Sequence, residues 1–175
     1  MAVLVESGVD GVTLEEVAAR SGVAKTTLYR HFGSKEELVA TAAQGCLVQH
    51  ATPDTGNLEE DLLSIFGQYQ ASEEAKHFPV LFPALLDAGT RDPQMRRLVD
   101  QILEERSRPI RTVLRLAQAR GEIDPELDLD AAVATIVGPL TYRRFVERRE
   151  VTPEFKGQVL RGAVAALRAT AAART

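Results

Sequence analysis

The side chains with the clearest chemical potential lie between Val17 and Lys35. This stretch contains Arg20, Lys25, Arg30 and Lys35 and no aspartate or glutamate. Guanidinium and ammonium groups bond to phosphate oxygens and to the O6/N7 edge of guanine. The whole chain carries a formal net charge of −4, which excludes a protein that coats nucleic acid by bulk attraction. The pattern therefore predicts a local nucleic-acid-binding patch, with a merely solvated basic face as the alternative.

Cys46 and His50 are a second group with chemical potential. They lie four residues apart, which would place both on one helix face, and His77 might join them to hold a metal ion. A redox role for Cys46 is another alternative, but a lone cysteine is usually inert packing. The chain has one cysteine, so an internal disulfide and a multi-cysteine zinc site are excluded. We predict no metal and no cofactor.

Motifs of catalysis and of membrane insertion are missing from the sequence. It contains no Gly-rich phosphate loop, no nucleophile elbow and no metal-binding helix motif, so we predict that the protein is not an enzyme. No run approaches the roughly 20 apolar residues that span a bilayer, and the N-terminus has no secretory signal. We expect a cytoplasmic protein without a membrane partner.

Apolar residues recur at helical spacing nearly throughout, and no stretch alternates as a strand would. We predict an all-α fold of about nine helices. Residues 51–57 contain the turn formers Pro53, Asp54 and Gly56 and make the best domain boundary. The predicted domains are a DNA-binding domain over residues 1–45 and a larger helical domain over residues 46–175.

Two capping boxes mark helix starts on either side of a short helix. Residues 13–16 (TLEE) and 34–37 (SKEE) have the spacing in which a hydroxyl and a carboxylate cap each other's amides. The short helix between them spans about residues 25–31, and we expect Gly33 to close it in a left-handed conformation. Further on, we expect a helix or a pair of turns over 79–88 and a helix of about 28 residues from Pro93. A helix capped by Asp128 or Asp130 should run to about residue 148, and a last one from 153 to about 169.

The turn at residues 21–24 joins two short helices in the geometry of a helix-turn-helix, whose second helix lies in the major groove of DNA. The small Ala18 lies where the helices cross, and we expect packing from Leu14, Val17, Val23, Leu28 and Phe32.

The outward side of the second helix presents the side chains that can meet DNA. Leu28 and Phe32 face inward, which leaves Lys25, Thr26, Tyr29 and Arg30 pointing away from the core. Arginine, lysine and threonine can bond to base edges, and tyrosine hydroxyls commonly hold phosphates. Thr13 and Lys35 lie at helix N-termini, where backbone amides also favour phosphate.

Residues 11–38, GVTLEEVAARSGVAKTTLYRHFGSKEEL, closely resemble the DNA-binding signature of the tetracycline-repressor family. The resemblance implies a three-helix DNA-binding domain in which residues 25–32 form the recognition helix. It further implies that the bases are nearest Lys25, Thr26 and Arg30, and that the phosphate positions are Thr13, Thr27, Tyr29, His31 and Lys35.

Two positions depart from the family pattern. Ala24 stands where the family usually has a serine or threonine that caps the recognition helix, so this helix is expected to lose about 1 kcal/mol of stabilisation. Met1 falls partway into what resembles the first helix of the family, which leaves residues 2–7 before Gly8. Either this first helix is short, or further residues precede Met1.

The resemblance fades after about residue 45, and the prediction for the larger domain rests on spacing. In this family the effector pocket lies among the central helices, which makes a hydrophobic or amphipathic small-molecule effector plausible. The alternative is that the same residues fill the core. The candidate pocket residues are Phe66, Tyr69, Phe78, Leu81, Phe82, Leu85, Leu98 and Ile102.

The last two helices carry the prediction of a homodimer. Residues 131–142 contain no charged side chain, and a helix that is apolar all round must be covered on every side. Small residues at Gly162, Ala163 and Ala166 would let two helices approach closely. As in the family, we expect a four-helix interface, formed by Val133, Ile136, Val137, Leu140, Phe155, Val159, Ala163 and Leu167.

The sequence thus predicts a ligand-responsive transcriptional regulator, a repressor, whose partners are a double-stranded DNA operator, a small-molecule effector and a second copy of the chain. A two-fold dimer implies a near-palindromic operator. The alternative is a helical interaction or sensor module that has lost DNA binding.

Overall fold

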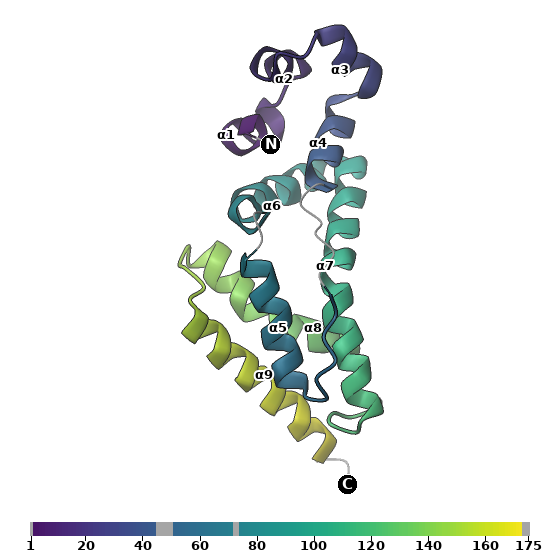
Figure 1. Ribbon diagram of the computed structural model, residues 1–175, viewed down its shortest axis with the longest axis vertical. Helices are drawn as coiled ribbons and strands as arrows, with labels where there is room; N and C mark the ends of the chain where they lie inside the picture. The colour runs from purple at the N-terminus through teal and green to yellow at the C-terminus, as the bar shows by residue number, and fades with distance from the viewer. Residues whose placement is uncertain (1, 45–50, 72–73, 173–175) are drawn as a thin grey trace. The chain divides into compact units, whose positions relative to one another are not determined.

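The computed structural model describes residues 2–44, 51–71 and 74–172, and all regular structure in these ranges is helical (Figure 1). The predicted all-α fold is confirmed. The elements are α1 (Ala2–Gly11), α2 (Leu14–Ser21), α3 (Lys25–His31), α4 (Lys35–Gln44), α5 (Leu58–Ala71), α6 (Glu74–Arg91), α7 (Pro93–Ala119), α8 (Leu129–Thr141), the π-helix η1 (Tyr142–Val146) and α9 (Pro153–Ala172).

The chain folds as two compact units. One comprises residues 1–48 and 73–104, and the other comprises residues 49–72 and 105–175, so the division falls inside α7. The predicted division by function, into residues 1–45 and 46–175, stays a prediction. Cys46 and His50, the candidates for a metal or redox site, lie outside the described residues.

The first unit packs α1, α4, α6 and the first half of α7 around one apolar cluster. Each of these helices turns a set of apolar residues inward, and burial of those side chains holds the unit together. The most deeply buried are Val12, Val39, Ala43, Leu81, Leu85 and Met95. An ion pair joins the end of α6 to α1, with Arg91 Nη2 2.9 Å from Asp10 Oδ2.

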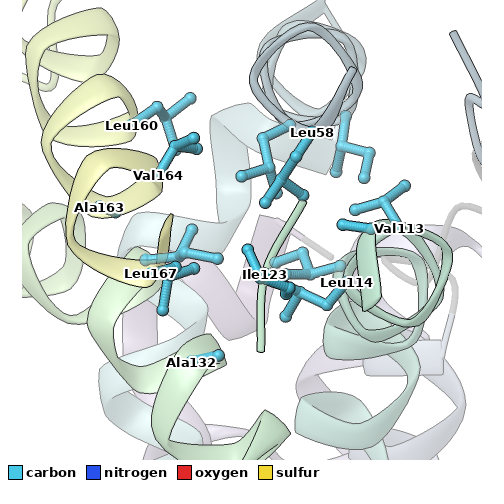
Figure 2. Close-up of a cluster of buried hydrophobic side chains, with 14 residues drawn as sticks. Leu58, Val113, Leu114, Ile123, Ala132, Leu160, Ala163, Val164 and Leu167 are labelled. Atoms are coloured by element: carbon cyan, nitrogen blue, oxygen red, sulfur yellow. The ribbon is translucent and has the colours of Figure 1, made fainter. Parts of the chain in front are cut away.

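The second unit has its own core, formed by α5, the second half of α7, α8 and α9. Figure 2 shows side chains of α9 and α5 turned toward Val113 and Leu114 of α7, with Ile123 between them. Several of these side chains are completely buried, among them Leu58, Leu62, Ile65, Val113, Leu114, Ile136 and Leu160.

A buried carboxylate fixes the loop before α5. Asp61 is 0% exposed, and its Oδ1 accepts hydrogen bonds from the backbone N–H of Thr55 (2.8 Å) and from its hydroxyl (2.9 Å). Arg120 lies 3.6 Å from Oδ2 of Asp61 and also pairs with Asp54 and Glu122. The loop predicted over residues 51–57 is confirmed, and its place is set by these charges rather than by apolar burial alone.

Two helix boundaries were predicted wrongly. The helix expected to continue to about residue 148 leaves the α-conformation after Thr141, because η1 follows with the π-type hydrogen bond from Glu147 N to Tyr142 O. The element expected over residues 79–88 is a longer helix, α6, with Pro79 and Pro83 inside it.

None of the helices described here has the length and apolar character to cross a membrane.

Candidate nucleic-acid interface

Helices α2 and α3 follow each other through a three-residue turn (Figure 1). The Thr13 hydroxyl starts α2 by accepting a hydrogen bond from Glu16 N (3.1 Å). Gly22 ends it in a left-handed conformation, with φ of 69°, and donates its N–H to Ala18 O (3.0 Å). A residue with a Cβ is strained at this φ, whereas glycine is not. The predicted helix-turn-helix is therefore present.

A small apolar cluster fixes the angle between the two helices. Leu14, Ala18 and Leu28 are buried, and Val17 and Phe32 pack against them as predicted. Val23 was also expected in this cluster, and that prediction is wrong. It lies in the turn itself, where its N–H donates to Ser21 Oγ, and the residue is 38% exposed.

The two ends of α3 differ from each other and from expectation. Ala24 occupies the N-cap and makes no side-chain hydrogen bond, as its methyl group predicts. At the other end, Phe32 leaves the helix in an extended conformation, with φ of −124°. Gly33 does not adopt a positive φ, so its predicted left-handed role is wrong. Its N–H instead donates to Glu37 Oε2 (2.8 Å), a cap for α4.

The side of α3 opposite Leu28 faces solvent. Leu28 points into the core, so the side chains on the opposite side of α3 point away from it. Tyr29 is 50% exposed, and Thr27 lies at the edge of this face and is half-buried. The other exposed side chains are Lys25, Thr26, Arg30 and His31.

Lys35 is held at the start of α4. Its Nζ donates to the carbonyl oxygen of Asp10 (2.9 Å), near the end of α1. The predicted cap of α4 is confirmed, since Ser34 Oγ accepts a hydrogen bond from Glu37 N (3.1 Å). Lys35 is the first residue of α4, and the N-terminus of a helix favours an anion.

Two acidic side chains that are distant in sequence contact this basic surface, and sequence reasoning missed both. The Tyr29 hydroxyl donates to Glu15 Oε1 (2.7 Å), and Arg20 donates to Glu6 Oε2 (2.6 Å). The hydrogen bond from Tyr29 lowers the pKa of the Glu15 carboxyl and raises the pKa of the Tyr29 phenol. In each pair the partners are 14 residues apart, so no local spacing signals the contact.

Comparison with known proteins identifies the family. A family model described as bacterial regulatory proteins, tetR family, matches residues 1–42. A second, described as the C-terminal domain of tetracyclin repressor-like proteins, matches residues 52–167, more than half of the chain. The chain belongs to the TetR family. It is a transcriptional regulator, as the signature at residues 11–38 implied.

Relatives in the TetR family resemble this chain over most of its length. An HTH-type transcriptional regulator of Mycobacterium tuberculosis is 31% identical over 153 residues, which cover 86% of this chain and 75% of the relative. The DNA-binding transcriptional repressor TetR of Mycobacteroides abscessus is 30% identical over 146 residues, covering 79% and 76%. A crystal structure of a TetR-family regulator from Rhodococcus sp. has the same fold, with a TM-score of 0.72, 22% identity and coverage of 94% and 92%.

The candidate effector residues are divided between the two compact units. Phe66 and Tyr69 pack against the core of the second unit, and the Tyr69 hydroxyl donates to Arg106 O (3.0 Å). The other six belong to the first unit, where the ring of Phe78 stacks on that of Phe82, with 4.8 Å between centroids. The remaining four are buried in its core, namely Leu81, Leu85, Leu98 and Ile102.

The candidate dimer residues all belong to the second unit. Half of them are buried in the core of the protomer: Ile136, Leu140, Ala163 and Leu167. The other half, Val133, Val137, Phe155 and Val159, are half-buried. The exposed residues of α8 and α9 include a set of small ones, most of which the sequence did not mark as interface candidates: Ala131, Ala134, Gly138, Gly162, Ala165, Ala166 and Ala169.

Proposed function

We propose that this TetR-family regulator is a ligand-responsive repressor that binds a near-palindromic DNA operator as a homodimer. The observation that carries the proposal is the exposed basic face of α3. This helix is the second of a helix-turn-helix whose first helix, α2, is capped by Thr13. A relative that is 30% identical is named a DNA-binding transcriptional repressor. The repressing role is transferred from that relative.

The proposed DNA contacts divide into two kinds. Lys25, Thr26 and Arg30 extend from the exposed side of the recognition helix and would read base edges in the major groove. The phosphate contacts would fix the register of the protein on the duplex without reading its sequence. They are assigned to Thr13, Thr27, Tyr29, His31 and Lys35.

The proposed effector is a small hydrophobic or amphipathic molecule. Support comes from an aromatic pair within each unit: Phe66 and Tyr69 of α5 meet edge-on in the second unit, and Phe78 stacks on Phe82 of α6 in the first. The candidate contacts remain those predicted from the sequence, at positions 66, 69, 78, 81, 82, 85, 98 and 102. Binding would release the operator by changing the separation of the two recognition helices in the dimer.

The proposed dimer joins α8 and α9 of one protomer to the same helices of its partner. The exposed small residues of these helices would allow two backbones to approach closely, and exposed apolar side chains are costly to leave in water. The predicted residues that are buried in the protomer, such as Ile136 and Leu167, would support this surface from behind.

Selection of binding sites from a pool of random duplexes tests the proposal. Purified full-length protein is expected to enrich a near-palindromic sequence, and the enriched duplex should bind a dimer with an affinity that falls steeply with salt. Absence of enrichment, with weak binding that salt does not change, would instead support an interaction module that has lost DNA binding. The uncapped N-terminus of α3 at Ala24 is the observation in favour of that second candidate.

A further inference from the structure

A carboxylate lies on the surface that is proposed to meet DNA. Glu15 is in the first turn of α2, and its Oε1 accepts a hydrogen bond from the Tyr29 hydroxyl on α3 (2.7 Å). Both side chains are exposed, so the contact lies within reach of a bound polyanion. The nearby Lys25 also attracts this carboxylate. A negative charge in this position repels DNA phosphates and therefore weakens the proposed DNA binding.

The phenol of Tyr29 can donate one hydrogen bond at a time. A phosphate oxygen in DNA can accept a hydrogen bond but cannot donate one, and the same holds for an ionised carboxylate. While the hydroxyl donates to Glu15, it therefore cannot donate to phosphate. The contact seen in the structure and the contact proposed with DNA exclude each other.

We propose that Glu15 competes with DNA phosphate for the Tyr29 hydroxyl and thereby lowers the affinity of the protein for DNA of any sequence. The inference rests on the proposed phosphate contact of Tyr29. Because phosphate contacts carry no sequence information, the competition acts alike on operator and non-operator DNA. Its consequence is a shorter residence on bulk DNA, since non-specific binding depends on such contacts.

The test measures binding of the full chain to a random-sequence duplex by fluorescence anisotropy at two low salt concentrations. The variants are Glu15→Gln, Tyr29→Phe and the double variant. Glu15→Gln keeps an acceptor oxygen but removes the charge that makes the carboxylate the stronger acceptor for the Tyr29 hydroxyl. Glu36→Gln is the matched control, since Glu36 also lies in the first turn of a helix, α4, beside a proposed phosphate contact. It removes the same charge without touching Tyr29. Glu15 and Tyr29 are exposed and Glu36 is half-buried, and thermal unfolding should show that every variant is folded.

We expect Glu15→Gln to bind the duplex about two- to fivefold more tightly than Glu36→Gln does, the range typical of an exposed charged contact. In the Tyr29→Phe background this gain should disappear. An equal gain for Glu15→Gln and Glu36→Gln, or a gain that persists without the hydroxyl, would overturn the competition while leaving DNA binding intact. If Tyr29→Phe does not weaken binding in the Glu15→Gln background, the phosphate contact of Tyr29 is itself wrong. If no variant binds DNA, the proposed function fails.

Discussion

Arg30 and Lys35 are both basic residues of the candidate interface, but their surroundings leave them different roles. Arg30 lies on the exposed side of α3, and within the described part of the chain the structure records no hydrogen bond or ion pair from it. Its guanidinium is available to form paired bonds to a guanine. Lys35 already donates one hydrogen bond, to Asp10 O, at the start of α4. Its position suits a phosphate contact.

Alanine substitutions should separate these roles. Arg30→Ala is expected to cost about 1–3 kcal/mol of binding to the selected site and to relax the base preference there. Lys35→Ala should weaken binding to all sequences alike and reduce the slope of log affinity against log salt by about one. Titrations of the selected duplex and of a random duplex, each at several salt concentrations, measure both effects. Equal losses on the two duplexes for Arg30→Ala would contradict base reading.

At the scale of the helix, α3 begins without a side-chain cap, whereas α2 has one. Ala24 has the extended backbone typical of an N-cap, with ψ of 136°, and lacks only the hydroxyl. Ala24→Ser should therefore raise the free energy of unfolding by about 0.5–1 kcal/mol, because the new oxygen can accept from an amide in the first turn. Urea denaturation measures the change.

The opposite substitution at the start of α2 is the control. Thr13→Ala removes the hydrogen bond from Glu16 N and should lower the free energy of unfolding by about 1 kcal/mol. If Ala24→Ser is neutral while Thr13→Ala is destabilising, the first turn of α3 is already satisfied in another way. The backbone bonds from Thr27 N and Leu28 N to Ala24 O would then be sufficient.

Whether an element could be predicted depended on how local its determinants are. The starts of α2 and α4 follow from residues 13–16 and 34–37, because a cap and its amide lie within one turn. The end of α8 does not, since the π-type bond at Tyr142 has no marker in the residue pattern. The contact between Glu15 and Tyr29 joins two helices and depends on their packing angle. Spacing along the chain contains no information about that angle.

At the scale of the whole molecule, apolar periodicity predicted which residues are buried but not whether they line a pocket or fill the core. Leu81, Leu85 and Leu98 were proposed as pocket residues, and the structure buries them in the core of the first unit. A pocket wall and a core face require the same residue types at the same helical spacing. The candidates from α5, Phe66 and Tyr69, belong to the other compact unit, and no pattern in the sequence predicted this division.

The proposed dimer depends on which side chains of α8 and α9 are exposed in the protomer. Ala163 is mostly buried in its own protomer, whereas the neighbouring Gly162 is exposed and offers more surface to a partner. A Cβ added at Gly162 meets nothing within 4 Å, so a long side chain fits the isolated protomer there. Gly67 on α5 is also exposed and also has open space around it. The two glycines differ in whether a partner helix is proposed to cover them.

Gly162→Arg should therefore weaken dimerisation by about tenfold or more, because the guanidinium would be forced into a close contact between two apolar helices. The free energy of unfolding of the protomer should not fall, since glycine inside a helix is unfavourable and its replacement relieves that cost. Sedimentation velocity over a range of concentrations measures the first effect, and urea denaturation the second. Gly67→Arg should remain as dimeric as the unsubstituted protein. If Gly162→Arg also remains dimeric, the partner does not cover this face of α9, and the recognition helices must be paired through another surface.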